Sequence, residues 1–247
     1  MTSALPSADI YYECNLTTDI KPLTTNDYAP MTDDKPIYDI TPPISSDIKV
    51  WPGDTPSTRE VLRDVQRGDA STTSVLHATV HLGAHADAPN HCDADAPSIG
   101  ECDLDAYLGP CQVIHVHADR GARLLPDSLK TPVVAQRLLI ATGAYPNPLE
   151  FNRDFAALSP ELIESLRHRG VKLIGIDTPS VDPFEAEDLP AHRAALGHGI
   201  AILEGLVLDG VPEGMYELIA LPLKLIGFEA SPVRAILKRT SPQNSLR

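Results

Sequence analysis

The segment from residue 81 to residue 91 constrains this chain more than any other, because it concentrates metal-binding side chains in a short stretch. It contains His81, His85, Asp87 and His91, at relative offsets of 0, 4, 6 and 10. An extended chain alternates its side chains between two faces, so even offsets can place all four on one side. Gly83 and Pro89 argue against one continuous helix, whereas a strand that turns at Gly83 would let the four side chains converge. Imidazole and carboxylate groups are ligands of divalent ions such as zinc, so the segment predicts a metal site.

The density of histidines supports this interpretation. Four of the nine histidines in the chain fall between residues 77 and 91. A single histidine is more often structural than ligating, but this concentration favours metal binding over chance. His77 shares the even register, yet its place in the body of a predicted strand favours a structural role.

A second stretch, residues 192–204, contains candidates that could complete the site. Glu204 is a lone acid in an apolar run, and a buried carboxylate is costly unless it is paired or metal-bound. A strand-end residue that faces solvent explains Glu204 equally well from the sequence alone. His192 and His198, taken singly, are each more often structural than ligating.

Composition and charge limit the kind of fold and the classes of binding partner that we expect for this chain. The chain has 247 residues, of which 43% are apolar, enough for a single domain with one good-sized core. Acidic side chains outnumber basic ones by 34 to 20, and the net charge of −14 argues against nucleic acid and membranes as partners. The sequence contains no G-x-S-x-G elbow, no H-E-x-x-H, no P-loop and no G-x-G-x-x-G fingerprint.

Cysteine usage and hydropathy predict a cytoplasmic protein. The four cysteines form no C-x-x-C pair, and no disulfide framework is expected in a chain of this size, which favours a reducing cytosol. Cys92 adjoins the histidines, but an ordinary thiol is expected there rather than a ligand. The N-terminus lacks the pattern of a secretory signal, and no apolar run approaches the roughly 20 residues of a membrane-spanning helix.

Local patterns predict a β-dominated α/β domain with few short helices. Residues 1–33 are polar and without clear period, so we expect a loose N-terminal extension before a single domain over residues 34–247. Strands are predicted at residues 36–40, 50–54 (ending in a turn), 75–82, 111–116, 137–142, 171–177, 199–208, 216–221 and 235–238, with a turn at 108–110. One helix is expected after Ser159, ending at Gly170, and another at residues 188–196. The absence of regular βα alternation disfavours a TIM barrel or a doubly wound sheet.

Two further features have alternative interpretations. Trp51, the only tryptophan, lies beside Pro52-Gly53, where it could be a core aromatic or could offer a flat face to an aromatic ligand; a core role is slightly favoured. Residues 177–180 (Asp-Thr-Pro-Ser) follow a predicted strand and could line a pocket, although a simple turn is the favoured interpretation.

The segment 81–91 also resembles a known signature, H-x-G-[TA]-H-x-D-x-P-x-H, of the metal-dependent cyclase family. Residues 51–56, 107–111, 175–180, 202–206 and 231–234 are similar to the bacterial kynurenine formamidase branch of that family. The resemblance runs from about residue 36 to residue 239. It implies a cyclase-like fold of the swivelling β/β/α type, with a mixed sheet or barrel-like core and flanking short helices.

The resemblance also implies a centre with two zinc ions, for which manganese or cobalt are possible substitutes. The implied metal ligands are His81, His85, Asp87, His192 and Glu204, with Asp87 and Glu204 contacting both ions. His91 corresponds to the catalytic acid/base, and Trp51 to a residue that contacts the aromatic ring of the substrate. Ala84 replaces the usual threonine of the signature, so we expect intact chemistry with one lost hydrogen bond near the ligands.

The activity implied is hydrolysis of N-formyl-L-kynurenine to L-kynurenine and formate, by a cytoplasmic homodimer. Three alternatives remain open at this point. The first is another amide hydrolase of the family, for example one that opens the ring of isatin. The second is a metal-binding domain without activity, against which the presence of His91 beyond the implied ligands counts. The third is a structural zinc site, which would ordinarily be rich in cysteine.

Overall fold

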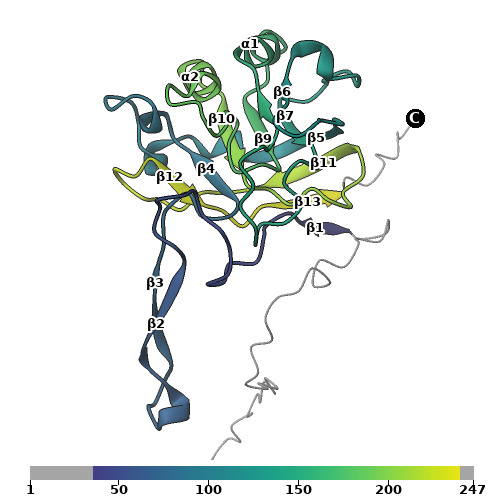
Figure 1. Ribbon diagram of the computed structural model, residues 1–247. Coiled ribbons are helices and arrows are strands. Elements are labelled where there is room, and N and C mark those ends of the chain that lie inside the picture. The colour runs from purple at the N-terminus through teal and green to yellow at the C-terminus, as the bar shows by residue number, and fades with distance from the viewer. Residues whose placement is uncertain (1–35, 240–247) are drawn as a thin grey trace, which may run out of the picture.

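The computed structural model describes residues 36–239, and its body is a mixed, curled sheet of nine strands with two helices (Figure 1). The predicted extension at residues 1–33 lies outside the described residues. The β-dominated α/β architecture expected from the sequence, a mixed sheet with flanking short helices, is confirmed. No helix within residues 36–239 is long and apolar enough to cross a membrane.

The sheet has antiparallel strands at both edges and a parallel block in its middle. Its first strands, in spatial order, are β1 (Ile37–Asp39), β13 (Ile236–Arg239), β11 (Gly214–Ile219) and β5 (Leu108–His115), each antiparallel to the next. Parallel pairing then joins β5 to β7 (Arg137–Ala141), β9 (Leu173–Ile176) and β10 (Ala201–Glu204). The last strands, β4 (His85–Asp87) and β12 (Ala230–Pro232), are again antiparallel. A short parallel pair, β6 (Arg123–Leu124) and β8 (Ala157–Leu158), lies apart from this sheet.

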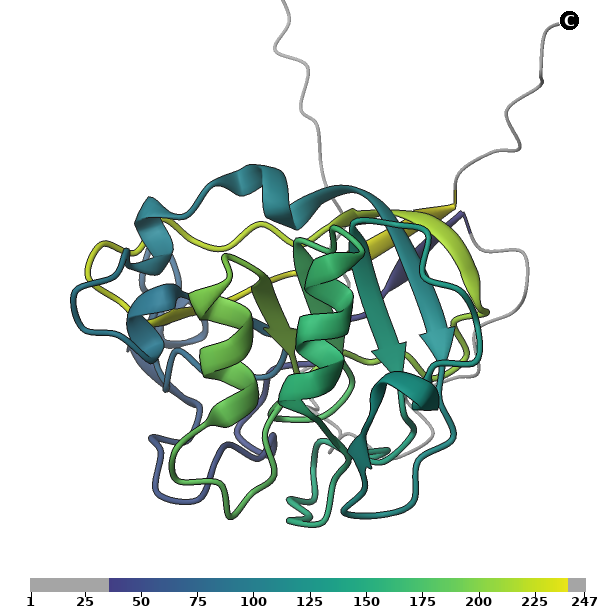
Figure 2. The same cartoon turned by 90° about the horizontal axis from the view of Figure 1, so that it is seen from above.

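Both faces of the parallel block are buried, as is usual for parallel strands. The helices α1 (Pro160–His168) and α2 (Pro190–Gly197) lie side by side over one face, as Figure 2 shows. Their apolar side chains, such as Leu162, Leu166 and Ala195, pack there with Ile174 and other strand residues. Apolar side chains of the opposite face form a second core cluster inside the curl of the sheet.

The limits of α1 follow directly from its sequence. The hydroxyl of Ser159 accepts a hydrogen bond from the backbone N–H of Leu162 at 3.1 Å, and Pro160 occupies the first turn, where its missing N–H costs nothing. Gly170, at a φ of +76°, lies just beyond the helix in the left-handed region that glycine adopts readily. Both predicted ends of this helix are confirmed.

Three local predictions are wrong. Residues 50–54 form only the predicted turn and no strand; the turn is closed by the Asp54 N–H and the Trp51 carbonyl at 2.9 Å, with Gly53 at a φ of +107°. Residues 108–110 belong to β5, where long-range pairing with β11 overrides their turn-like composition. The strand predicted at 75–82 ends at His77 and does not lead into the histidine segment.

The strands β2 (Thr58–Arg63) and β3 (Thr73–His77) form a hairpin that projects far from the body of the molecule (Figure 1). The sequence patterns did not predict β2. Its side chains are mostly exposed. Leu62 and Leu76 on this hairpin are 55% and 62% exposed, which is unusual for leucine. His77 lies on the hairpin as well, with its Nε2 at 2.9 Å from Glu60, so the structural role expected for it agrees with its position.

Candidate metal centre and pocket

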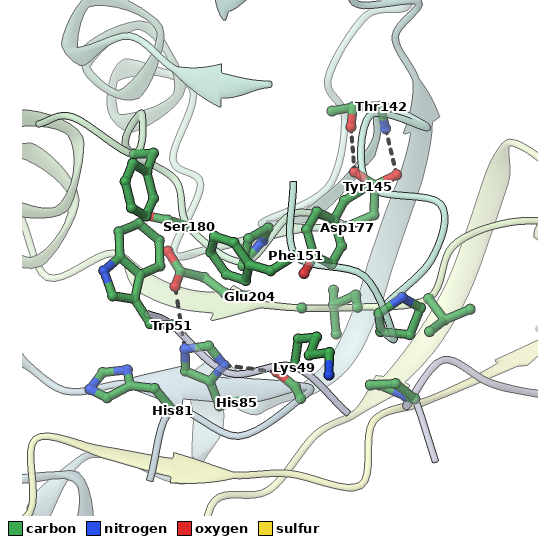
Figure 3. Close-up of a pocket in the computed structure, with 18 of the residues that line it drawn as sticks. Lys49, Trp51, His81, His85, Thr142, Tyr145, Phe151, Asp177, Ser180 and Glu204 are labelled. Carbon is green, nitrogen blue, oxygen red and sulfur yellow. Dashed lines mark hydrogen bonds and ion pairs between the residues drawn. The ribbon is translucent and has the colours of Figure 1, made fainter. Parts of the chain in front are cut away.

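The register of two antiparallel strands brings the first three site residues together. In the pairing of β4 with β10, His85 lies directly opposite Glu204, and residues directly opposite each other share one face of a sheet. Asp87 follows His85 by two residues, so it points to that same face. The three side chains are buried, and Figure 3 shows Glu204 and His85 joined across the pocket floor.

The two remaining histidines of residues 81–91 lie at the same site, but they come from the chain before and after β4. His81 lies in the bend before β4, and Gly83, at a φ of +58°, turns the chain between them. His91 ends a 3-10 turn, Pro89–His91, which follows β4. The rings of His81 and His91 lie 4.7 Å apart between centroids. The predicted convergence after a turn at Gly83 is therefore observed, but the even spacing places only His85 and Asp87 on a common strand.

His192 comes from the N-terminal part of α2 and is held there by a buried carboxylate, Asp182. One oxygen of Asp182 accepts hydrogen bonds from the His192 backbone N–H at 3.0 Å and from its Nδ1 at 2.8 Å. The Ala191 N–H also donates to Asp182, so the carboxylate satisfies donors at the start of the helix. With Nδ1 occupied in this way, Nε2 of His192 is left to face the cluster.

The two central carboxylates each face two groups of imidazoles. Asp87 Oδ1 lies 3.2 Å from His81 Nδ1 and 3.6 Å from His85 Nε2, whereas its Oδ2 lies 3.3 Å from His192 Nε2. Glu204 repeats the pattern, with Oε2 at 3.3 Å from His85 Nε2 and Oε1 at 3.1 Å from His192 Nε2. Each carboxylate thus lies between the His85 side and the His192 side of the cluster.

The unsatisfied polar atoms of the cluster fit a bound cation. His85 Nε2 and both carboxylate oxygens of Asp87 are fully buried and make no hydrogen bond within the described part of the chain. Buried polar atoms nearly always have a partner, so such a group requires an explanation. Two sets of side chains have their ligand atoms within 4.8 Å of one another: His81, Asp87 and His91, and His85, Asp87 and Glu204. Imidazole and carboxylate donors in this arrangement suit zinc, manganese or cobalt.

The pKa shifts within the cluster also favour a bound cation. Burial opposes ionisation of Asp87, but His192 and His81 outweigh it and hold the pKa of Asp87 well below its usual range. Burial likewise opposes protonation of His85, yet Glu204 and Asp87 raise the pKa of His85 to about 9. The site therefore keeps buried negative charge that needs a positive partner, which a divalent ion supplies as well as protons do.

His91 differs from its neighbours in charge state. Burial lowers its pKa below the ordinary value and outweighs the opposing attraction of Asp87, and His81 and His192 add to the lowering. A histidine with a lowered pKa is neutral at neutral pH and can accept a proton there.

Above the cluster opens a large cavity of about 1260 Å³, walled on one side by aromatic rings. Trp51 stacks on Phe184 with centroids 4.8 Å apart, and it meets Phe151 and Phe155 edge to face at 5.6 and 6.1 Å. Tyr145 extends the same wall. Several of these residues surround the pocket in Figure 3.

The cavity lies at the carboxyl ends of the parallel strands, where ligands commonly bind in open α/β sheets. Asp177 follows β9 there and accepts hydrogen bonds from Thr142 Oγ1 at 2.6 Å and from the Gly143 N–H at 2.8 Å. Burial nevertheless raises the pKa of Asp177, against these hydrogen bonds. The sequence favours a simple turn at residues 177–180, but Asp177 and Ser180 also line the cavity.

The structure brings together every site residue named from the sequence: His81, His85, Asp87, His91, His192 and Glu204, with Trp51 in the cavity wall. Glu204 is buried rather than facing solvent. His198, by contrast, lies outside the cluster, with its Nε2 at 3.1 Å from Glu164. Cys92, Cys102 and Cys111 are free thiols.

Sequence reasoning missed three kinds of site residue. Asp182 carried only a weak signal, an acid a few residues before a predicted helix that contains His192. No local sequence pattern indicated Lys49 or the aromatic residues after position 144 as site residues. Only the tertiary fold places these side chains in the cavity.

Comparison with known proteins agrees with this architecture. The putative cyclase family matches residues 38–183, more than half of the chain. The chain therefore belongs to the cyclase family. The cluster of histidines and carboxylates described above is its candidate functional site.

Solved structures share the fold over most of their length. A protein described as a potential metal-dependent hydrolase with cyclase activity is 26% identical, with a TM-score of 0.72 over 83% of this chain and 98% of its own. A predicted metal-dependent hydrolase from Bacillus stearothermophilus is 27% identical, with a TM-score of 0.70 over 81% and 97%. Isatin hydrolase A from Labrenzia aggregata, bound to benzyl benzoate, is 25% identical, with a TM-score of 0.72 over 83% and 94%.

Proposed function

We propose that this protein is a metal-dependent hydrolase that converts N-formyl-L-kynurenine to L-kynurenine and formate. The observation that carries the proposal is the buried histidine and carboxylate cluster at the base of a cavity with an aromatic wall. The cluster has the donors for divalent ions, and the wall suits an aryl substrate. The names of the similar structures, which include metal-dependent hydrolases, support the reaction class.

The proposed ligands divide into two groups that share two carboxylates. His81, His85 and Asp87 would hold one ion; Asp87, His192 and Glu204 would hold the other, with Glu204 reaching both. When bound, a divalent ion supplies acidification of water and polarisation of a carbonyl group. Zinc is the proposed native metal.

The protein side chains would then position the substrate and move protons. The aromatic wall at Trp51 orients the aryl ring, so that the formamide carbon faces the cluster. Addition of water to that carbon requires a base, and breaking the C–N bond requires an acid that protonates the arylamine nitrogen. His91, neutral at pH 7 and beside the ligands, would accept the proton from water and return it to the nitrogen.

The first test is release of L-kynurenine and formate by purified protein, as isolated, after chelation, and after zinc is added back. We expect rapid release that is lost on chelation and restored by zinc. Zinc-loaded protein that releases neither product would contradict the proposed substrate.

Replacement of His91 tests its role separately, because the structure also groups His91 with His81 and Asp87 as possible ligands. For His91→Ala we expect turnover to fall by about 10²–10⁴-fold while the metal content, measured by elemental analysis, stays at the wild-type value. Loss of a metal equivalent in this variant would make His91 a ligand, and near-normal turnover would remove it from catalysis.

Isatin ring opening is the second candidate reaction, and the similarity to an isatin hydrolase favours it specifically. Both reactions add water to a carbonyl carbon attached to an arylamine nitrogen, so the same cluster could serve either. A panel of aryl formamides and cyclic amides, assayed side by side, decides between them by the ratio of kcat/KM values.

A homodimer, implied by the family resemblance, and a cytoplasmic location, expected from the cysteine usage, stay predictions. The projecting β2–β3 hairpin supports the homodimer, because an isolated two-stranded hairpin is marginally stable in water and this one exposes Leu62 and Leu76. Light scattering on the purified protein gives the mass that tests it.

A further inference from the structure

The charged groups that line the cavity are almost all of one sign. Among the lining residues that belong to the described part of the chain, seven carry carboxylates and Lys49 is the single lysine or arginine. Two of these carboxylates are satisfied by the protein: Glu204 accepts from the Val181 N–H at 2.6 Å, and Asp177 accepts from Thr142. A lone cation in such an acidic lining calls for an explanation.

Within residues 36–239, the Lys49 side chain has no partner. Its side chain is exposed and makes no ion pair or hydrogen bond with any residue between 36 and 239. Three other described lysines do have a partner: Lys172 and Lys238 each face a carboxylate, and Lys130 donates to the Asp127 carbonyl. The ammonium group of Lys49 is therefore free to bind an anion that enters the cavity.

The chain around Lys49 fixes its position relative to the aromatic wall. The Lys49 N–H donates to the Pro148 carbonyl at 2.9 Å, and the preceding Ile48 is buried, so the backbone is anchored at Lys49 and at the residue before it. Trp51 follows two residues later, and two residues of chain span at most about 7 Å. One short segment thus offers an aromatic face and a cation to the same cavity (Figure 3).

We propose that Lys49 binds a carboxylate of the substrate and so selects aryl amides with an amino-acid end over those that lack the carboxylate. This inference rests on the proposed function, because N-formyl-L-kynurenine carries an α-carboxylate on a chain next to its formamide. With the formamide at the cluster and the ring against Trp51, that chain extends into the cavity that Lys49 lines. The acidic lining suits the α-ammonium group at the same end of the substrate.

Binding can be measured without catalysis, because Trp51 is the only tryptophan and reports on the cavity by its fluorescence. The zinc-loaded full chain is titrated with L-kynurenine and with kynurenamine, which lacks only the carboxylate. The variants are Lys49→Met and Lys49→Arg, with Lys224→Met as the matched control, since Lys224 is an exposed lysine outside the cavity lining.

We expect Lys49→Met to weaken L-kynurenine binding about tenfold relative to kynurenamine, as for loss of a partly exposed charged hydrogen bond. Lys49→Arg should retain most of the preference, and Lys224→Met all of it. A Lys49→Met protein that keeps the wild-type ratio of affinities would overturn the inference, as would a wild-type protein without preference for the carboxylate.

The outcome is separable from that of the proposed reaction. Carboxylate-dependent binding through Lys49 without release of formate would support the carboxylate site and overturn the formamidase reaction. Release of formate, with unchanged binding of L-kynurenine in Lys49→Met, would support the formamidase reaction and overturn the carboxylate site.

Discussion

At the scale of single residues, the candidate centre depends on groups that hold the ligands as much as on the ligands themselves. His85 directs its Nδ1 to the Gly83 carbonyl at 2.9 Å, and His192 directs its Nδ1 to Asp182. In both, the occupied Nδ1 leaves Nε2 for the cluster. Such partners orient a histidine ligand and raise its basicity.

Replacement of Asp182 tests this arrangement. In Asp182→Asn an amide must replace the carboxylate that now accepts from two backbone N–H groups and from Nδ1 of His192. We expect zinc affinity, measured by competition with a chelator, to fall by about 10–100-fold while circular dichroism shows an intact fold.

The matched control is Asp154→Asn, because Asp154 pairs with Arg120 on the surface, away from the cluster. Its zinc affinity should equal that of the wild type. Equal affinity in Asp182→Asn as well would show that Asp182 does not position His192.

At the scale of elements, a close backbone contact between Gly205 and Gly83 sets the distance between β10 and the bend before β4. Gly205, at a φ of +64°, follows Glu204, and a Cβ built there would lie 2.2 Å from the Gly83 carbonyl oxygen. That carbonyl is also the partner of His85. Glycine at this position therefore allows β10 and the bend before β4 to approach closely enough for Glu204 to face His85.

Gly205→Ala should consequently destabilise the protein by more than the roughly 1–2 kcal/mol that an alanine costs in the left-handed region. Gly199→Ala is the matched control, since Gly199 has a similar φ of +71° and no atom lies within 4 Å of the position that a Cβ would take there. Urea unfolding followed by circular dichroism measures both. Equal losses in the two variants would mean that the close backbone contact has no energetic role.

At the scale of the whole molecule, the centre joins segments that are far apart in the chain. Residues 81–91 meet residues 192–204 through the pairing of β4 with β10 and through α2 packed beside that strand. A bound ion would link these segments only in the folded state, because the unfolded chain does not hold them together.

Removal of metal should therefore lower the melting temperature. A ligand present at 100 times its Kd stabilises the native state by about 2.7 kcal/mol, which corresponds to roughly 5–10 °C in a chain of this size. Calorimetry of zinc-loaded and chelated protein measures the difference, and added zinc should restore it. Identical melting curves would count against a metal-linked fold.

Much of the site chemistry and several elements were readable from the sequence. The metal-binding character of residues 81–91 and the start of α1 at Ser159 depend on side chains a few residues apart, whose geometry the local backbone controls. The turn-like residues 108–110 became part of β5 for the opposite reason, since pairing with β11 outweighed local preference.

The sequence by itself determined which donors this protein offers to a metal, and that its fold is β-dominated with a few capped helices. Only the tertiary structure decided that Glu204 lies opposite His85, that Asp182 holds His192, and that Lys49 enters the cavity. The physical reason is that donor chemistry and capping are local properties, whereas strand register and cavity lining follow from packing between distant segments.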